Sequence, residues 1–325
     1  MKNGSELRAR YNDVNRGVYF IGTTPPKSDT PIEQVSTIAD KLLERVSDID
    51  VDGLIVYDIQ NEASRTSRPR PFPFKLTHDP RLYSSLLNQK STRPVITYKS
   101  VVQSNGEEFD QWASEAWHDY GVRDIVLVGS PSGQNNISLP LADAYKTLVA
   151  NENDFFIGGI TIAERHANKG NEHAKLIEKH QQGCNFFISQ AIYNAQATID
   201  MLTRYAIECQ QQGLKPQRII LTFSPCGSEK TLKFIEWLGV SVPEATSLRI
   251  LNAERPLYES IRICSNTLGQ ILDAVLPYKL PLGLNIESLT NRKEEIDGSI
   301  LLYKLLRSTM DNYLAKQELN GLAYD

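Results

Sequence analysis

Three acidic residues stand at or just after the end of short apolar runs in the sequence. Asp58 and Glu62 follow GLIVY, and Glu287 follows LGLNI. A carboxyl group held at the end of a buried segment can serve as a general acid or base once burial tunes its pKa. For Glu62, an ion pair with Arg65 or Arg68 is an equally good interpretation.

An amide and a phenol follow another apolar run, CNFFIS, as Gln190 and Tyr193. The glutamine amide presents a donor beside an acceptor, which suits a heterocycle with an amide-like edge, such as a pterin or a flavin. We therefore expect Gln190 and Tyr193 to contact a substrate. A glutamine that only caps the rim of the fold through backbone hydrogen bonds is the plainer alternative.

A loop of small residues, GSPSG, begins with Gly129 and Ser130. Residues this small let a ligand approach the backbone, and their amides suit a phosphate or the edge of a flavin ring. A simple turn is the alternative, because Gly, Ser and Pro are the usual turn residues.

Metal ligation has little support in the sequence. Glu164, His166 and His173 are a conceivable set, but no HExxH or similar close spacing is present. The four cysteines are widely spaced as well, which argues against a disulfide framework or a zinc site. We expect no metal.

A proline-rich stretch at 62–80 combines arginines with aromatic residues. These side chains suit a carboxylate or a phosphate together with a ring. A solvated loop pinned by its own aromatic residues fits equally well. The residues concerned are Arg65, Arg68, Arg70, Phe72 and Phe74.

The elements that position these residues alternate along the chain. Strands are predicted at 17–22, 53–58, 94–99, 124–129, 155–161, 184–189, 218–223 and 282–287. Helices are predicted at 31–46, 107–120, 139–150, 171–182, 195–212, 257–275 and 300–314. This order predicts a single (β/α)8 TIM-barrel domain over 1–325, with its core at about 17–315 and a long loop at 59–80. A doubly wound sheet is the rival, but no GxGxxG fingerprint follows any strand.

Composition excludes several function classes. The chain has 325 residues, and 35 Lys+Arg against 39 Asp+Glu give a net charge of −4. This balance lacks the basic field of a nucleic-acid-binding protein. Since no apolar run approaches the length of a membrane span, and the amino-terminal segment lacks an apolar signal core, we expect a cytoplasmic protein.

Four segments, in order, resemble the methylenetetrahydrofolate reductases. They are PPK at 25–27, GVRDIVLVGSP at 121–131, the block at 154–194 from DFFIGGIT to QAIYN, and the block at 221–245 that begins LTFSPCG. The resemblance runs from about residue 17 to about residue 305, and it implies a TIM barrel.

The resemblance also implies an activity and its cofactors. Members carry FAD, take electrons from NADH or NADPH, and pass hydride to 5,10-methylenetetrahydrofolate, a folate substrate; many are homo-oligomers. By position, Gln190 matches a pterin-binding glutamine. The residues that match flavin contacts, or fall on their positions, are Thr97, Ser130, His166, Glu172 and Lys179.

The sequence departs from this family where its catalytic acid should stand. The family's glutamate aligns with Gly22, and an aspartate near the flavin aligns with Ser130. We expect Asp58, Glu62 or Glu287 to replace the acid. Three hypotheses follow: a reductase with a rearranged acid, a folate- or pterin-binding relative with a different and even flavin-free reaction, or a catalytically silent partner subunit.

Overall fold

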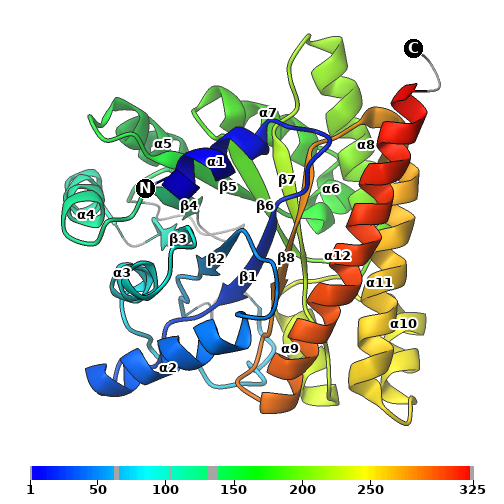
Figure 1. The fold of residues 1–325 in the computed structure, drawn as a ribbon, viewed down its shortest axis with the longest axis horizontal. Helices are drawn as coiled ribbons and strands as arrows, with labels where there is room; N and C mark the ends of the chain where they lie inside the picture. Colours follow the sequence, from blue (N-terminus) through cyan, green and yellow to red (C-terminus); the bar gives the residue numbers. More distant parts are fainter. Residues whose placement is uncertain (1, 62–65, 103, 130–137, 323–325) are drawn as a thin grey trace.

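The structure, a computed structural model, describes residues 2–61, 66–102, 104–129 and 138–322. Eight parallel strands close into a barrel in sequence order, each paired with the next and β8 with β1 (Figure 1). The strands are β1 (Tyr19–Thr23), β2 (Gly53–Val56), β3 (Val95–Ser100), β4 (Asp124–Val128), β5 (Phe156–Thr161), β6 (Phe186–Ala191), β7 (Arg218–Phe223) and β8 (Leu282–Glu287). The predicted (β/α)8 TIM barrel is confirmed.

Helices cover the outside of this barrel. They are α1 (Lys2–Tyr11), α2 (Ile32–Arg45), α3 (Pro80–Lys90), α4 (Gly106–His118), α5 (Leu141–Ala150), α6 (Ala163–Lys169), α7 (Glu172–Gln181), α8 (Ala195–Gln211), α9 (Glu229–Trp237), α10 (Glu244–Leu251), α11 (Pro256–Val275) and α12 (Lys293–Leu322). A short 3-10 helix, η2 (Leu276–Tyr278), follows α11. In the described part of the chain, no helix combines the length and the apolar character that crossing a membrane requires.

The predicted helix ranges do not include α1, α3, α6, α9 or α10, although they include α5 and α7, which have ten residues each, as α1 does. The start of α3 did have a signal: Asp79 caps it by accepting from the Arg81 N–H at 2.8 Å, and Pro80 occupies its first turn. The predicted strand at 184–189 was placed two residues early. β6 pairs with β5 from Phe186 onward, whereas the N–H of Cys184 still donates to the carbonyl of Lys179 in α7.

The interior of the barrel is apolar below its carboxyl end. Phe20, Ile55, Ile96, Phe186 and Ile220 are all fully buried there. A second apolar layer lies between the strands and the helices. The rigid wall that results holds the residues at the carboxyl ends of the strands in fixed positions.

Helix α1 closes the amino end of the barrel, where Figure 1 shows it lying across the sheet. The Tyr11 ring packs against Phe156 and Phe186, each with ring centroids 4.9 Å apart. The buried Arg218 donates to the carbonyls of Tyr11 at 3.0 Å and Arg10 at 2.7 Å. A guanidinium at the carboxyl end of a helix satisfies its unpaired carbonyls and opposes its dipole.

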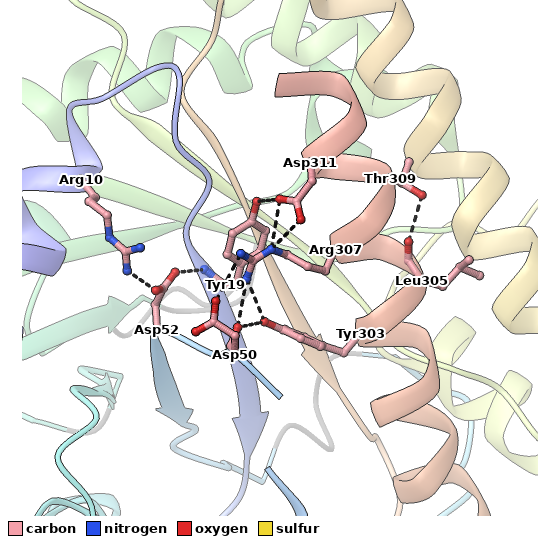
Figure 2. Close-up of polar contacts among 9 residues, drawn as sticks. All are labelled: Arg10, Tyr19, Asp50, Asp52, Tyr303, Leu305, Arg307, Thr309 and Asp311. Carbon is pink, nitrogen blue, oxygen red and sulfur yellow. Dashed lines mark hydrogen bonds and ion pairs between the residues drawn. The ribbon is translucent and has the colours of Figure 1, made fainter. Parts of the chain in front are cut away.

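A polar cluster ties α12 to the same end of the barrel (Figure 2). The guanidinium of Arg307 lies 3.7 Å from the centroid of the Tyr19 ring and is ion-paired with Asp311 at 3.1 Å. Tyr19 donates through its hydroxyl to Asp311 at 2.9 Å and through its N–H to Asp52 at 2.9 Å. These groups bond to one another, which fits a role in holding the fold together.

Candidate functional site

The carboxyl end of the barrel, here called the mouth, holds Glu287 at the end of β8. Glu287 stands in register with Gly22 of β1. Burial raises the pKa of its carboxyl to about 7, and a hydrogen bond from Tyr57 partly opposes the rise. A carboxyl group with this pKa can both donate and accept a proton at neutral pH.

Tyr57 connects Glu287 to the neighbouring strands. Its hydroxyl donates to Glu287 and accepts from Nδ2 of Asn285 at 2.7 Å. The same Nδ2 donates to Oγ1 of Thr222 at 3.2 Å, and the Tyr57 ring meets the Tyr98 ring edge-on at 4.8 Å. Among the described residues, Oδ1 of the buried Asn285 has no hydrogen-bond partner. The chain of bonds fixes the orientation of the Glu287 carboxyl.

Gly22 leaves the space that this arrangement needs. A Cβ atom at Gly22 would lie 2.8 Å from Cε2 and 2.9 Å from the hydroxyl of Tyr57, and 3.1 Å from Cβ of Glu287. A side chain at Gly22 and the Tyr57 ring therefore exclude each other. Glu287, on the neighbouring strand, lies beside Gly22, the position at which the family's acid would stand by resemblance.

Asp58 faces a different part of the mouth. It lies in a cavity of about 220 Å³, here called the side pocket. Other residues of its lining are Gln60, His78, Tyr98, Lys99 and Trp112. The Asp58 carboxylate accepts from the Ser100 N–H at 2.8 Å and from Nε2 of Gln60 at 2.6 Å, while burial raises its pKa.

Gln190 and Tyr193 use their polar atoms on the backbone of the protein. Nε2 of Gln190 donates to the carbonyl of Leu238 at 2.7 Å, and the Tyr193 hydroxyl donates to the carbonyl of Ser224 at 2.6 Å. Glu164 accepts from the N–H of Ser241 at 2.9 Å. Gln190 and Glu164 thus hold the segment between α9 and α10 at the rim, and the side-chain oxygen of Gln190 takes no part in these bonds.

Three residues expected to contact a flavin make hydrogen bonds within the protein. Thr97 donates to Oγ of Ser84 in α3 at 2.8 Å. The buried Glu172 accepts from the N–H of Ile162 at 3.1 Å, and the buried Lys179 donates to the carbonyl of Ile160 at 2.6 Å. Glu172 and Lys179, both in α7, therefore hold the backbone at the carboxyl end of β5 in place.

Of the remaining predicted residues, His166 and Gly129 lie in the described part of the chain. In α6, Nδ1 of His166 lies 3.5 Å from Nδ1 of His173, and in the described residues no group of three or more His, Cys, Asp or Glu is arranged to hold a metal. Gly129 packs close to Leu141 after β4. Glu62, Arg65 and Ser130 lie outside the described residues.

The loop after β2 crosses to α9, on the far side of β1 and β8. The Arg70 guanidinium lies 5.3 Å from the centroid of Phe234 and 5.0 Å from that of Trp237. Nε1 of Trp237 donates to the carbonyl of Arg68 at 3.0 Å. Of the two interpretations of this loop, the structure supports the one in which its cations and rings pin it in place.

Removing this stacking should loosen the loop. We expect Arg70→Ala to lower the free energy of unfolding by about 1 kcal/mol, because stacked cations contribute that much at partly buried sites. Urea denaturation measures the loss. Arg68→Ala, in the same loop but with an exposed side chain, is the matched control, and equal effects of both variants would contradict the assigned role of the stack.

A larger cavity, of about 660 Å³, opens at the amino end of the barrel beside α1. Arg10 and Asp52 in its lining pair with each other, and Arg16 lies 3.5 Å from Asp13. Because its charges neutralise one another and it lies at the opposite end from the mouth, we do not place the site there.

Comparison with solved structures identifies a relative over nearly the whole chain. An uncharacterized protein from Clostridium thermocellum, which binds two copies of 5-methyl-5,6,7,8-tetrahydrofolic acid, is 33% identical. The match covers 92% of this chain and 97% of that protein, with a TM-score of 0.77. This chain belongs to the family of the clostridial protein. The sequence predicts membership of the methylenetetrahydrofolate reductases, which is a more specific claim, and this match does not show it.

Two other solved structures resemble this chain much less than the clostridial relative does. A 2,3-dimethylmalate lyase is 13% identical, with a TM-score of 0.45 over 81% of this chain and 94% of that one. An oxaloacetate acetylhydrolase is 11% identical, with a TM-score of 0.48 over 87% of this chain and 80% of that one. No family model and no curated protein matches the sequence.

Sequence reasoning missed Tyr57 and Asn285, which share the face of their strands with the interior residues. Alternation was the available signal, because Asn285 stands two positions before Glu287 and Tyr57 two after the buried Ile55. We did not use this alternation, because an aromatic residue or an asparagine next to a turn usually serves packing or capping.

Proposed function

We propose that this chain binds a reduced folate at the mouth of the barrel and exchanges a proton with it through Glu287. The observation that carries the proposal is the folate bound by the clostridial relative, which is 33% identical over 92% of this chain. Glu287 adds a chemical reason, since its pKa of about 7 suits proton transfer at neutral pH.

A proton donor has a clear use on a reduced folate. One-carbon units are carried on N5, on N10 or on both, and protonation of such a nitrogen makes it a better leaving group. The Tyr57 hydroxyl, held by Asn285, keeps the Glu287 carboxyl in one orientation. In this proposal Glu287 is the catalytic acid, and Tyr57 and Asn285 are positioning residues.

Reduction of 5,10-methylenetetrahydrofolate with FAD and NADH or NADPH is the more specific candidate. The position of Glu287 beside Gly22 favours this reduction, because the neighbouring strand then supplies a carboxyl group where the family has its catalytic acid. Three residues that the resemblance assigns to a flavin, Thr97, Glu172 and Lys179, already make hydrogen bonds within the protein. We therefore assign no step to a flavin. One-carbon transfer without flavin uses the same acid.

Ligand titration tests the proposal. In isothermal titration calorimetry we expect 5-methyltetrahydrofolate to bind the purified protein, and the absence of binding would refute a folate-related role. A parallel titration with FAD separates the two reactions. Binding of FAD with a shift of its visible absorbance favours the reductase, and a protein that binds folate alone favours one-carbon transfer.

A further inference from the structure

The side pocket contains a cation that lacks an acceptor. Lys99 lies on the outer face of β3, in register with Leu127, and its ammonium is 5.1 Å from the centroid of the Trp112 ring. Within the described ranges, Lys99 makes no hydrogen bond or ion pair. An ammonium group has three donors, and partial burial without acceptors disfavours its charge. The pKa of Lys99 is lowered for this reason.

The nearby carboxylate does not fill this need. Asp58 uses one oxygen to accept from the Ser100 N–H at 2.8 Å and the other to accept from Gln60 at 2.6 Å. It attracts Lys99 through space, but no ion pair joins the two side chains. Both Asp58 oxygens are thus engaged by neutral donors, and Asp79, the other carboxylate in the lining, is paired with Arg81 at 2.7 Å. The Lys99 donors stay available to a ligand in the cavity.

The side pocket and the environment of Glu287 are neighbours, with Tyr98 and Tyr57 between them. Tyr98 lines the pocket, and its ring packs edge-on against Tyr57 at 4.8 Å. Tyr57 in turn contacts Glu287. One layer of aromatic rings therefore separates the acid from the cation. A ligand with a heterocycle at one end and a carboxylate at the other carries one group for each of these two places.

We propose that the side pocket binds a carboxylate of the glutamate tail of the folate, with Lys99 as its cationic partner. The inference rests on the proposed folate binding and extends it to the end of the ligand remote from the chemistry. The volume of about 220 Å³ is sufficient for a group of the size of glutamate but too small for a whole folate. Trp112 provides an apolar wall for the methylene groups of the tail.

Two ligands that differ only in the tail test this inference. Calorimetry compares 5-methyltetrahydrofolate with 5-methyltetrahydropteroate, which lacks the glutamate. We expect the full-length protein to bind the folate about tenfold more tightly, as one charge-assisted hydrogen bond implies. Lys99→Met should abolish this preference while leaving the affinity for the pteroate unchanged.

Two further variants separate charge from packing. Lys99→Arg keeps the cation and should keep the preference, whereas Lys146→Met removes an exposed lysine of α5 and should change nothing. Circular dichroism confirms that each variant is folded. Equal weakening of both ligands by Lys99→Met, or an unchanged preference, would overturn the tail site.

The failure of the tail site is distinguishable from that of the proposed function. If the unaltered protein binds both ligands equally, folate binding stands and the role of Lys99 is wrong. If it binds neither ligand, the proposed function fails and the tail site fails with it.

Discussion

Glu287→Gln is expected to lower turnover of 5,10-methylenetetrahydrofolate by about 10²- to 10⁴-fold while leaving folate affinity nearly unchanged, because general acid catalysis contributes that much. The wild-type rate should fall as pH rises through about 7, where the raised pKa of Glu287 places loss of the proton. Initial rates between pH 5.5 and 8.5 measure both effects. The glutamine amide keeps the shape of the side chain but has no acidic proton to transfer.

The same variant should make the fold more stable in alkaline solution. The folded-state pKa of Glu287, about 7, lies above its ordinary value of 4.5, so folding retains a proton that the unfolded chain releases. Stability from this group is therefore present below about pH 4.5, declines up to about pH 7 and stays low above it. Glu287→Gln should gain about 1–3 kcal/mol over wild type at pH 8.

Thermal unfolding at pH 5 and pH 8 measures this gain. Asp124 also has a raised pKa, of about 6, so only the difference between variant and wild type isolates Glu287. Glu107→Gln, an exposed glutamate of α4, is the matched control. A variant that gains stability but keeps its full rate would leave Glu287 as a buried acid without a catalytic role.

The barrel was predictable because it depends on a pattern spread over the whole chain. β7 and β8 were predicted with their observed bounds, since arginine or leucine starts each apolar run and a turn ends it. The short helices were not predictable, because their positions depend on contacts with distant segments. α1, for example, is fixed by Tyr11 and Arg218, which are far apart in the sequence.

The direction in which each candidate acid points could not be predicted from the sequence. Asp58 and Glu287 both stand at strand ends, and their direction depends on the residue at which each strand stops. β2 ends at Val56, two residues earlier than predicted, and Tyr57 rather than Asp58 packs against the interior. Positional matching gave Thr97, Glu172 and Lys179 roles at a ligand, which stay predictions, because such matching carries no information about which face of an element a side chain occupies.

A side chain at Gly22 should disturb the site and the fold together. Gly22→Ala places a Cβ atom 2.8 Å from the Tyr57 ring, which must move. We expect a loss of about 1–3 kcal/mol in the free energy of unfolding, as is usual when a packed interior receives an extra group. Moving Tyr57 also removes its hydrogen bond to Glu287, so the pKa of Glu287 should rise and the fall in rate should shift to higher pH.

A double-mutant cycle with Tyr57 shows whether the two positions are coupled. In a Tyr57→Leu background, the cost of Gly22→Ala should shrink, because the ring that it strikes is gone. Gly269→Ala is the control, since a Cβ atom there meets nothing within 4 Å and alanine favours helix α11. Additive costs would mean that Gly22 and Tyr57 do not compete for one space. A non-additive result would mean that Tyr57 can lie beside Glu287 only because β1 has no side chain at Gly22.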